Sequence, residues 1–348
     1  MRSRHFSLLL IGLLILTGSV ASALPQAVPK RVDVRVITDE PEAVLFIVSK
    51  KRAGRPITEA DWQRLFSTEG YARLKKREAA MKRAFEDEDF KSFVLSDSLA
   101  ARAEALEETL ERWKRADIDN AARRALAYLP RHASLRAKVY PSIKPRGNSF
   151  VFEVRTDPAI FLYLDPEMSA EQFENTLAHE LHHIGYGGSC QPEAVTTQGA
   201  RDAVAWVGAF GEGLAMLAAA GGPDAHPHLA SKPEDRKQWD LNVAKFNEDL
   251  ASVEKFLLDV LAKRLSEEEE QKRGFEFYGV QGPWYTVGWK MSATIEKVFG
   301  RAKLIESACD KRKLLAVYND AARAVNRSGR EKLALWSPSL IDGLGKKL

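Results

Sequence analysis

The sequence predicts an α+β protein that is predominantly helical, with a small sheet placed directly before one central helix. Apolar residues recur at intervals of three and four through most of the chain, which is typical of amphipathic helices. Residues 136–164 are instead rich in Val, Phe, Tyr and Ile and are interrupted by Pro, Gly and Asn, which favours short strands. A chain of 348 residues that is 45% hydrophobic and 29% charged is ordinary for a globular protein with a substantial core.

The first 23 residues have the pattern of a signal peptide. Arg2 and Arg4 precede an apolar run from Phe6 to Val20, and the small residues at 21–23 predict cleavage after Ala23. The run is about 15 residues, which is shorter than the roughly 20 needed to span a bilayer. We therefore expect an exported protein, periplasmic or secreted, with no stable membrane span after cleavage.

The remaining chain divides by composition into two regions. We expect residues 24–135 to form an N-terminal helical region and residues 136–348 to hold the sheet and the central helix, although the two could pack as one domain. In the first region, Glu40-Pro41-Glu42 predicts a helix start. The sequence "RVDVRV" just before it is compatible with a short strand. Thr58 ahead of Asp61 has a capping arrangement. One buried helix face is predicted at Leu99, Ala103, Leu106, Leu110 and Trp113.

The second region predicts strands followed by helices. We expect strands at about 136–140, 149–155 and 160–164. Ser169 then caps a helix that ends at Gly185 or Gly187. The apolar stretch from Ala203 to Gly222 is long enough to span a membrane, but it contains Glu212 and three internal glycines, so we interpret it as a buried helix. Further helices are expected at about 236–271, 288–299 and 311–326.

The central helix carries the motif H-E-x-x-H at His179, Glu180 and His183. Residues four apart lie on the same face of a helix, so the two imidazoles can be directed at one ion. Glu180 projects to the side, where it can act on water as a general base without binding the ion. This is the geometry of a zinc hydrolase.

A tetrahedral zinc ion needs a third protein ligand. Tyr186 and Ser189 occupy the positions where a second helical turn could supply a glycine and a third histidine, so that class is excluded. Glu212 is the candidate, because a lone carboxylate in an apolar stretch is costly to bury and a cation would remove that cost. Gly211 and Gly213 beside it are expected to allow close packing against the motif helix. Weaker candidates are Glu193, Asp202 and Glu248.

The other histidines and the cysteines have less specific surroundings. His182 points away from His183 and is expected in the core or behind the ligands. His226 and His228 lie in a Pro-rich loop. They could face the cleft, but we expect them to be exposed to solvent. Cys190 is not expected to bind the metal. Cys190 and Cys309 either form a disulfide in an oxidising compartment or remain two buried thiols.

At "HELHH" (179–183) and "FGEGLA" (210–215) the sequence resembles the gluzincins, zinc metallopeptidases that take two histidines from one helix and a glutamate from the next. It is similar, more specifically, to an uncharacterised bacterial family with an expected zinc-dependent peptidase activity. "DWQRLFSTEGYARLKKRE" and "GPWYTVGWKMSATIEKVFG" extend this similarity over most of the chain.

The resemblance implies a zincin-like fold and one Zn²⁺ on His179, His183 and Glu212, with Glu180 as the base. Gluzincins often add a Tyr or His that stabilises the oxyanion, for which Tyr285 is the first candidate and Tyr278 the second. The interval from the second histidine to the glutamate is longer than usual in gluzincins, and we expect an extra loop at 186–200 to account for it.

The predicted function is zinc-dependent hydrolysis of peptide bonds in a peptide or protein substrate. We expect the strand near 160–164 to lie at the sheet edge, where it could align an extended peptide by backbone pairing. Loss of Arg2 and Arg4 would lower the formal charge from +4 to +2, which gives no reason to expect a nucleic-acid partner. Two alternatives stay open: a non-catalytic exported binding protein with a structural metal, and a zinc hydrolase of a non-peptide amide.

Overall fold

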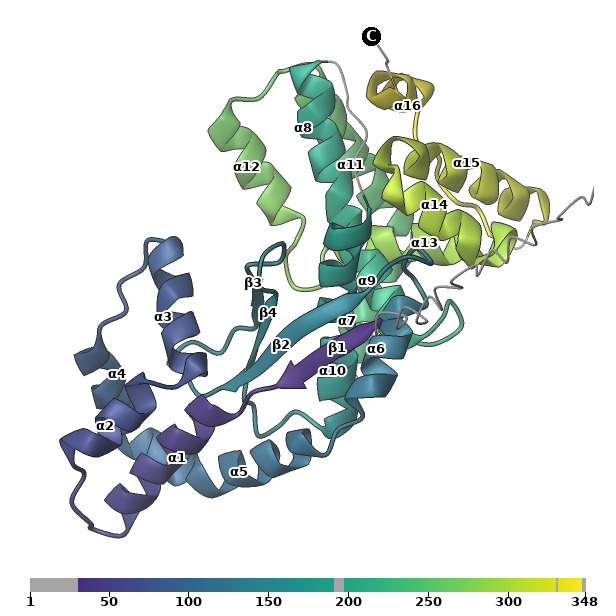
Figure 1. Cartoon of the computed structure of the whole chain (residues 1–348). Helices are drawn as coiled ribbons and strands as arrows, with labels where there is room; N and C mark the ends of the chain where they lie inside the picture. Colours follow the sequence, from purple (N-terminus) through teal and green to yellow (C-terminus); the bar gives the residue numbers. More distant parts are fainter. Residues whose placement is uncertain (1–30, 191–196, 330, 346–348) are drawn as a thin grey trace, which may run out of the picture. The chain divides into compact units, whose positions relative to one another are not determined.

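The sheet has four strands in the order β1-β2-β4-β3 (Figure 1). The computed structural model describes residues 31–190, 197–329 and 331–345, so the predicted signal peptide lies outside the described residues. Strand β2 pairs in parallel with β1 and β4, and β3 is antiparallel to β4. The α+β prediction is confirmed, and the short strand left open before residue 40 is β1. The strand bounds are β1 Val32–Val36, β2 Leu135–Ser142, β3 Phe150–Phe152 and β4 Ala159–Tyr163.

Two details of the predicted strands are wrong. The strand expected at 149–155 ends at Phe152, because Glu153 turns the backbone with a φ of +50°. The strand expected at an edge, near 160–164, lies between β2 and β3. The chain folds back so that residues 150–152 pair with residues 159–161 and cover β4. Its backbone is therefore already paired on both sides and does not offer a free edge to a peptide.

Two helices of the first region begin close to the starts that the sequence predicted, at Asp39 and Glu59. Thr58 and Asp61 form the expected capping box, in which the Thr58 amide donates to Asp61 at 2.7 Å. The face predicted from Leu99 to Trp113 is buried along α5. The bounds are α1 Asp39–Arg52, α2 Glu59–Phe66, α3 Glu69–Ala80, α4 Asp87–Val94, α5 Asp97–Lys114 and α6 Ile118–Leu126.

The helices after the sheet are more divided than the sequence predicted. The helix expected from 203 to 222 is α8, a 3-10 turn and α9 in succession. The helices expected over about 236–271 are α10, α11 and α12. Helix α13 starts at a proline, earlier than expected, since proline is compatible with a first helical turn. The bounds are α7 Ala170–Ser189, α8 Gln198–Val207, η1 Gly208–Phe210, α9 Gly211–Ala220, α10 Pro233–Ala244, α11 Phe246–Leu261, α12 Glu267–Glu276, α13 Pro283–Phe299, α14 Arg301–Cys309, α15 Lys311–Arg327 and α16 Pro338–Gly345.

Within the described part of the chain, Gln198–Ala220 is the stretch that is long and apolar enough to cross a membrane. Of its most apolar window, 67% is buried inside the protein. Its apolar side chains pack with α11, α13 and α15 in one core cluster that includes Val207, Phe210 and Leu217. This burial agrees with the interpretation of the stretch as a core element.

The motif helix α7 packs on the sheet. Phe173 and Leu177 of α7 are fully buried in one cluster with Val139 of β2 and Ile160 of β4. Helix α7 also contacts α6 and α9 extensively. The sheet and α6 thus support one side of α7, and another side is turned toward α9.

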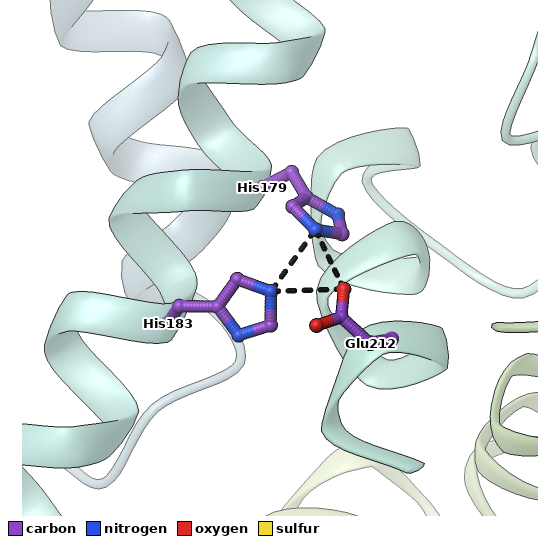
Figure 2. Close-up of side chains that lie close together, drawn as sticks. All are labelled: His179, His183 and Glu212. Carbon is purple, nitrogen blue, oxygen red and sulfur yellow. Dashed lines mark hydrogen bonds and ion pairs between the residues drawn. The ribbon is translucent and has the colours of Figure 1, made fainter. Parts of the chain in front are cut away.

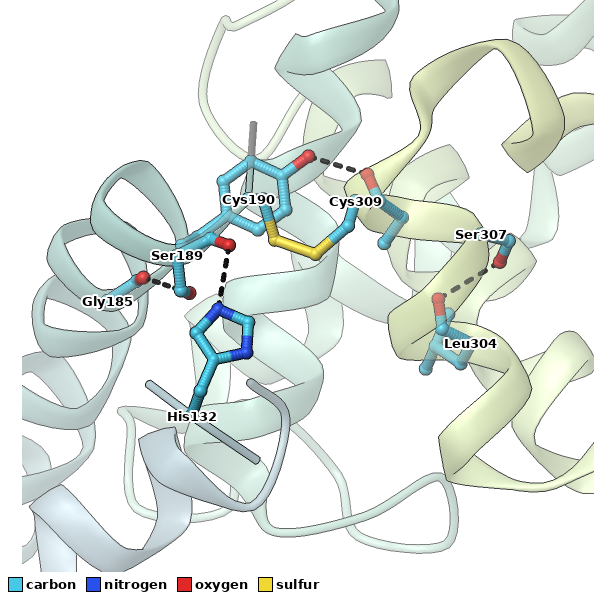
Figure 3. The surroundings of a disulfide bond; sticks show 9 residues. His132, Gly185, Ser189, Cys190, Leu304, Ser307 and Cys309 are labelled. Carbon is cyan, nitrogen blue, oxygen red and sulfur yellow. Dashed lines mark hydrogen bonds between the residues drawn. A yellow bond between two sulfur atoms is a disulfide. The ribbon is translucent and has the colours of Figure 1, made fainter. Parts of the chain in front are cut away.

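A disulfide joins Cys190, just after α7, to Cys309 at the end of α14 (Figure 3). The two Cα atoms are 4.9 Å apart. The hydroxyl of Tyr186 donates to the carbonyl of Ala308 at 2.6 Å, so α7 and α14 are tied together at two neighbouring points. The alternative of two buried thiols is therefore not the one adopted.

Candidate metal centre

Local sequence signals set the start and the faces of α7. The Ser169 hydroxyl accepts from the Gln172 amide at 3.1 Å, and the Gln172 side chain accepts from the Ser169 amide at 2.8 Å. This capping box is the start predicted from Ser169. The predicted end was wrong: the helix runs through Gly185 and Gly187 to Ser189. The motif residues therefore lie in a regular helix interior.

His179, His183 and Glu212 converge on one point, with the two imidazoles of α7 and the carboxylate of α9 directed toward one another (Figure 2). The Nε2 atoms of the two histidines are 3.0 Å apart, and each lies 3.2 Å from Oε2 of Glu212. These are the three residues named from the sequence as metal ligands, brought together across 29 and 33 positions of the chain.

The donor set and its spacing fit zinc. Zinc binds imidazole nitrogen at about 2.0–2.1 Å and carboxylate oxygen at about 2.0–2.2 Å, so two donors at a tetrahedral angle lie roughly 3.3 Å apart. The observed separations of 3.0–3.2 Å are close to that value. No fourth His, Cys, Asp or Glu of the described ranges joins the three. Such a set matches a catalytic site, which keeps one coordination position free.

The charges of the three side chains are strongly coupled. Burial favours the neutral form of Glu212, but His183 and His179 outweigh burial and hold the pKa of Glu212 well below its usual value. Burial likewise disfavours the charged form of His183, yet the Glu212 carboxylate raises its pKa above the ordinary value. Glu212 is thus an anion held beside two imidazoles, which is the state in which it can bind a cation.

Glu180 lies beside the cluster and is not part of it. It makes no hydrogen bond or ion pair with any residue that the structure describes. Its negative charge nevertheless contributes to the raised pKa values of His183 and Tyr285, so its carboxylate is close to both side chains. Glu180 is half-buried, and its carboxylate lies next to the candidate metal ligands without a partner among the described residues.

The two tyrosines named from the sequence lie next to each other and line different cavities beside the cluster. Tyr285 of α13 stacks near His179, with ring centroids 6.5 Å apart, and Tyr278 is 6.4 Å from Tyr285. Burial, followed by the charge of Glu212, raises the pKa of both hydroxyl groups. Both therefore stay protonated and can donate a hydrogen bond.

Two cavities flank the cluster. One of about 490 Å³ is bounded by His183, Glu212 and Tyr278, and one of about 360 Å³ is bounded by His179 and Tyr285. The three converging side chains thus contribute to the walls of both cavities, His183 and Glu212 to one and His179 to the other. Volumes of this size are within the usual range for ligand sites.

The glycines beside Glu212 do not act as predicted. Nothing lies within 4 Å of the position that a Cβ at Gly211 would take. A Cβ at Gly213 would instead lie 2.0 Å from the amide nitrogen of Trp289 and 2.5 Å from the carbonyl oxygen of Tyr285. The close packing is therefore against α13 and not against the motif helix. It places Glu212 and Tyr285 on two helix backbones in direct contact.

One prediction for the other histidines is wrong. His228 is half-buried and lines the cavity of His179 and Tyr285, where a solvated position was expected. Its Nδ1 lies 3.1 Å from the Ser231 hydroxyl, and its buried Nε2 has no hydrogen-bond partner among the described residues. The position of a loop in the fold brings it there, and no local sequence signal marks it. His226 lies 3.1 Å from Asp240, away from the cluster.

His182 belongs to the core, as predicted. It is fully buried, and burial together with the two neighbouring histidines lowers its pKa to about 3. It therefore stays neutral behind the ligands.

The weaker ligand candidates are not at the cluster. Glu193 lies outside the described residues. Asp202 pairs with Lys263 at 2.6 Å, and Glu248 is exposed on α11. Cys190 is held in the disulfide and has no thiolate to offer. The loop expected at 186–200 is shorter than predicted. Helix α7 extends to Ser189 and α8 starts at Gln198, so both ends of the expected loop are helical.

Residues 62–327 match the model of a family described as "Putative zinc dependent peptidase (DUF5700)". The chain belongs to this family. The matched range contains His179, Glu180, His183, Glu212 and Tyr285. The resemblance found in the sequence is thereby confirmed, and the family description supports zinc dependence and peptidase activity in coarse terms. No curated protein and no solved structure matches the chain.

Proposed function

We propose that this protein is an exported zinc-dependent peptidase that holds one zinc ion on His179, His183 and Glu212 and uses Glu180 as its general base. The observation that carries the proposal is the convergence of three donor atoms at 3.0–3.2 Å, beside a carboxylate that has no partner of its own among the described residues. The family match supports the same chemistry. The lack of a fourth ligand in the described ranges supports a catalytic role over a structural one.

Zinc bound at this site would supply a Lewis acid that polarises the scissile carbonyl and lowers the pKa of a water molecule. Glu180 accepts a proton as that water attacks the carbonyl carbon, and it then delivers the proton to the leaving amine. The side-by-side placement of Glu180 and the ligands on α7 allows both transfers from one carboxylate. The partial burial of Glu180 limits competition from bulk water.

Tyr285 is proposed to donate a hydrogen bond to the oxyanion that develops on the scissile carbonyl. Its hydroxyl is protonated, and its ring stacks near His179. A Tyr285→Phe variant should lower kcat by about 100-fold to 1,000-fold without loss of zinc, since removal of one oxyanion donor has this cost in other enzymes. If Tyr278→Phe shows the loss and Tyr285→Phe does not, the role passes to Tyr278.

Export is proposed from the sequence of residues 1–23, and the disulfide supports it. Disulfides persist in oxidising compartments outside the cytoplasm. The Cys190–Cys309 bond is consistent with such a destination. Fractionation of cells that express the full chain, with N-terminal sequencing of the product, would test both export and cleavage after Ala23.

The central test compares zinc content and hydrolysis in wild type, Glu212→Ala and Glu180→Gln. We expect one zinc per wild-type chain and its loss from Glu212→Ala. Glu180→Gln should keep the zinc and lose about 100-fold to 10,000-fold in kcat, which is the usual contribution of general acid–base catalysis. Full peptidase activity in Glu180→Gln, or full zinc content in Glu212→Ala, would contradict the proposal.

A further inference from the structure

Lys311 places a cation in the wall of the cavity beside His183 and Glu212. It is the first residue of α15. Its ammonium group makes no ion pair or hydrogen bond within residues 31–190, 197–329 and 331–345. Its neighbour Lys313, by contrast, lies 3.1 Å from Asp310. Lys311 is therefore the one of these two lysines whose charge is left unmatched.

A glycine makes room for this ammonium group. A Cβ at Gly208 would lie 2.3 Å from Nζ of Lys311 and 3.0 Å from its Cε, so the lysine side chain lies directly against the Gly208 backbone. Gly208 precedes Glu212 by four residues, which is about one helical turn, or roughly 6–8 Å along the axis. The ammonium group thus lies against the backbone about one turn before Glu212, in the cavity that Glu212 also lines.

The surroundings of Lys311 leave its charge poorly solvated. Burial lowers the pKa of Lys311, and no anion among the described residues counteracts this effect. A partly buried cation without a partner is costly, and an anion delivered into the cavity would offset that cost. Such a group is expected where a ligand supplies the missing charge.

The acidic side chains of the same cavity already have partners. Asp202 lies 2.6 Å from Lys263, and Glu270 accepts from the indole nitrogen of Trp206 at 2.7 Å. Glu212 faces the two histidines. Among the described residues, Lys311 is thus the charged side chain of this cavity wall that has neither an ion pair nor a hydrogen bond, which favours an anionic group on the ligand at its position.

We propose that Lys311 binds a carboxylate of the substrate and so selects peptides with a negative charge close to the scissile bond. An extended peptide advances about 3.3–3.6 Å per residue, so one helical turn corresponds to about two residues. Either the C-terminal carboxylate or an Asp or Glu side chain supplies the same chemistry. The inference rests on the proposed peptidase function, because it concerns the substrate of that site.

The test begins with zinc-loaded wild type and a defined mixture of peptides, whose products are sequenced by mass spectrometry. We expect cleavage to concentrate at a constant short distance from a carboxylate. The best peptide is then compared with its Glu→Gln or Asp→Asn counterpart and with its C-terminal amide, which separates a side-chain carboxylate from a terminal one. Loss of the charge should lower kcat/KM by roughly 10-fold to 100-fold, since hydrogen bonds to charged groups have this magnitude.

Lys311→Met should cleave the acidic peptide and its neutral counterpart at similar rates. Gly208→Ala should reduce the preference as well, because its methyl group displaces a flexible side chain and not backbone. Lys313→Met, an exposed lysine two positions away, is the matched control and should keep the full preference. Thermal unfolding of each variant confirms that it is folded. A wild type without a preference for acidic peptides, or a Lys311→Met variant that retains it, would overturn the inference.

A binding experiment separates failure of this inference from failure of the proposed function. If zinc-loaded wild type cleaves no peptide, the peptidase proposal fails. Acetyl-trialanine as the free acid and as the amide is then titrated into zinc-loaded Glu180→Gln, with the fluorescence of Trp206 in the cavity as one signal. Acetyl-Ala-Glu-Ala amide and its Gln counterpart are titrated in the same way. Tighter binding of either carboxylate ligand, abolished by Lys311→Met, supports the Lys311 site, and equal binding within both pairs refutes it.

Discussion

Replacement of Gly213 by alanine should displace Glu212 from the metal centre, because α9 and α13 touch at this glycine. The new Cβ would lie 2.0 Å from the Trp289 nitrogen and 2.3 Å from the Gly288 carbonyl carbon. Ordinary van der Waals contacts begin near 3.4 Å, so the two helices would have to separate by about 1.4 Å. Both contacts are with backbone atoms, which cannot turn aside as a flexible side chain can.

The magnitude follows from packing costs. Added atoms in a tightly packed interior destabilise by about 1–3 kcal/mol, and backbone clashes belong to the upper part of that range. We expect Gly213→Ala to lose about 3 kcal/mol, or roughly 4 °C in Tm for a chain of 348 residues. Zinc affinity should fall by about 10-fold to 100-fold, as it does when groups that orient metal ligands are changed elsewhere.

Gly211→Ala is the matched control on the other side of Glu212. It has no atom within 4 Å of the new Cβ. Both substitutions add the same helix-favouring residue, which is worth up to about 1 kcal/mol, so the difference between them isolates the clash. Thermal unfolding with and without excess zinc gives the stabilities, and competition with a chromogenic chelator gives the affinities. If the two variants unfold together and bind zinc equally, the assignment of Gly213 as the contact point is refuted.

Three further outcomes are expected. Glu40 is buried, and burial raises its pKa well above 4.5, so the folded state binds the proton more tightly than the unfolded chain. Wild type then loses stability as the pH rises from about 4.5 through the raised pKa of Glu40. Glu40→Gln should therefore be more stable than wild type at pH 8, as measured by urea unfolding. A difference in the free energy of unfolding that remains as large at pH 5 would contradict this. The disulfide closes a loop of 119 residues. Its reduction, or the double substitution Cys190→Ser and Cys309→Ser, should lower the free energy of unfolding by about 2–5 kcal/mol. An unchanged urea midpoint in the presence of dithiothreitol would count against this expectation. Zinc at a thousand times its Kd should stabilise wild type by about 4 kcal/mol, an effect that a chelator removes and that Glu212→Ala should lack.

The sequence by itself determined the local features of the protein. The capping residues at Thr58 and Ser169, the helical face of α5 and the pairing of His179 with His183 depend on neighbours within a few positions, where helix geometry fixes the spacing. Glu212 could also be named, because a lone carboxylate in an apolar stretch needs a compensating partner. These signals were sufficient to predict an α+β fold with a candidate zinc site.

Only the tertiary structure decided which distant surfaces meet. The side chain of Lys311 reaches the cavity of His183 because α15 packs near Gly208, and His228 enters the cavity of His179 because a loop folds over it. Strand β4 became an interior strand through pairing with β3, and Gly213 was matched to α13 and not to α7. Contacts of this kind join residues far apart in the chain. They depend on complementary packing of whole elements, and the periodicity of a single segment carries no information about its partner.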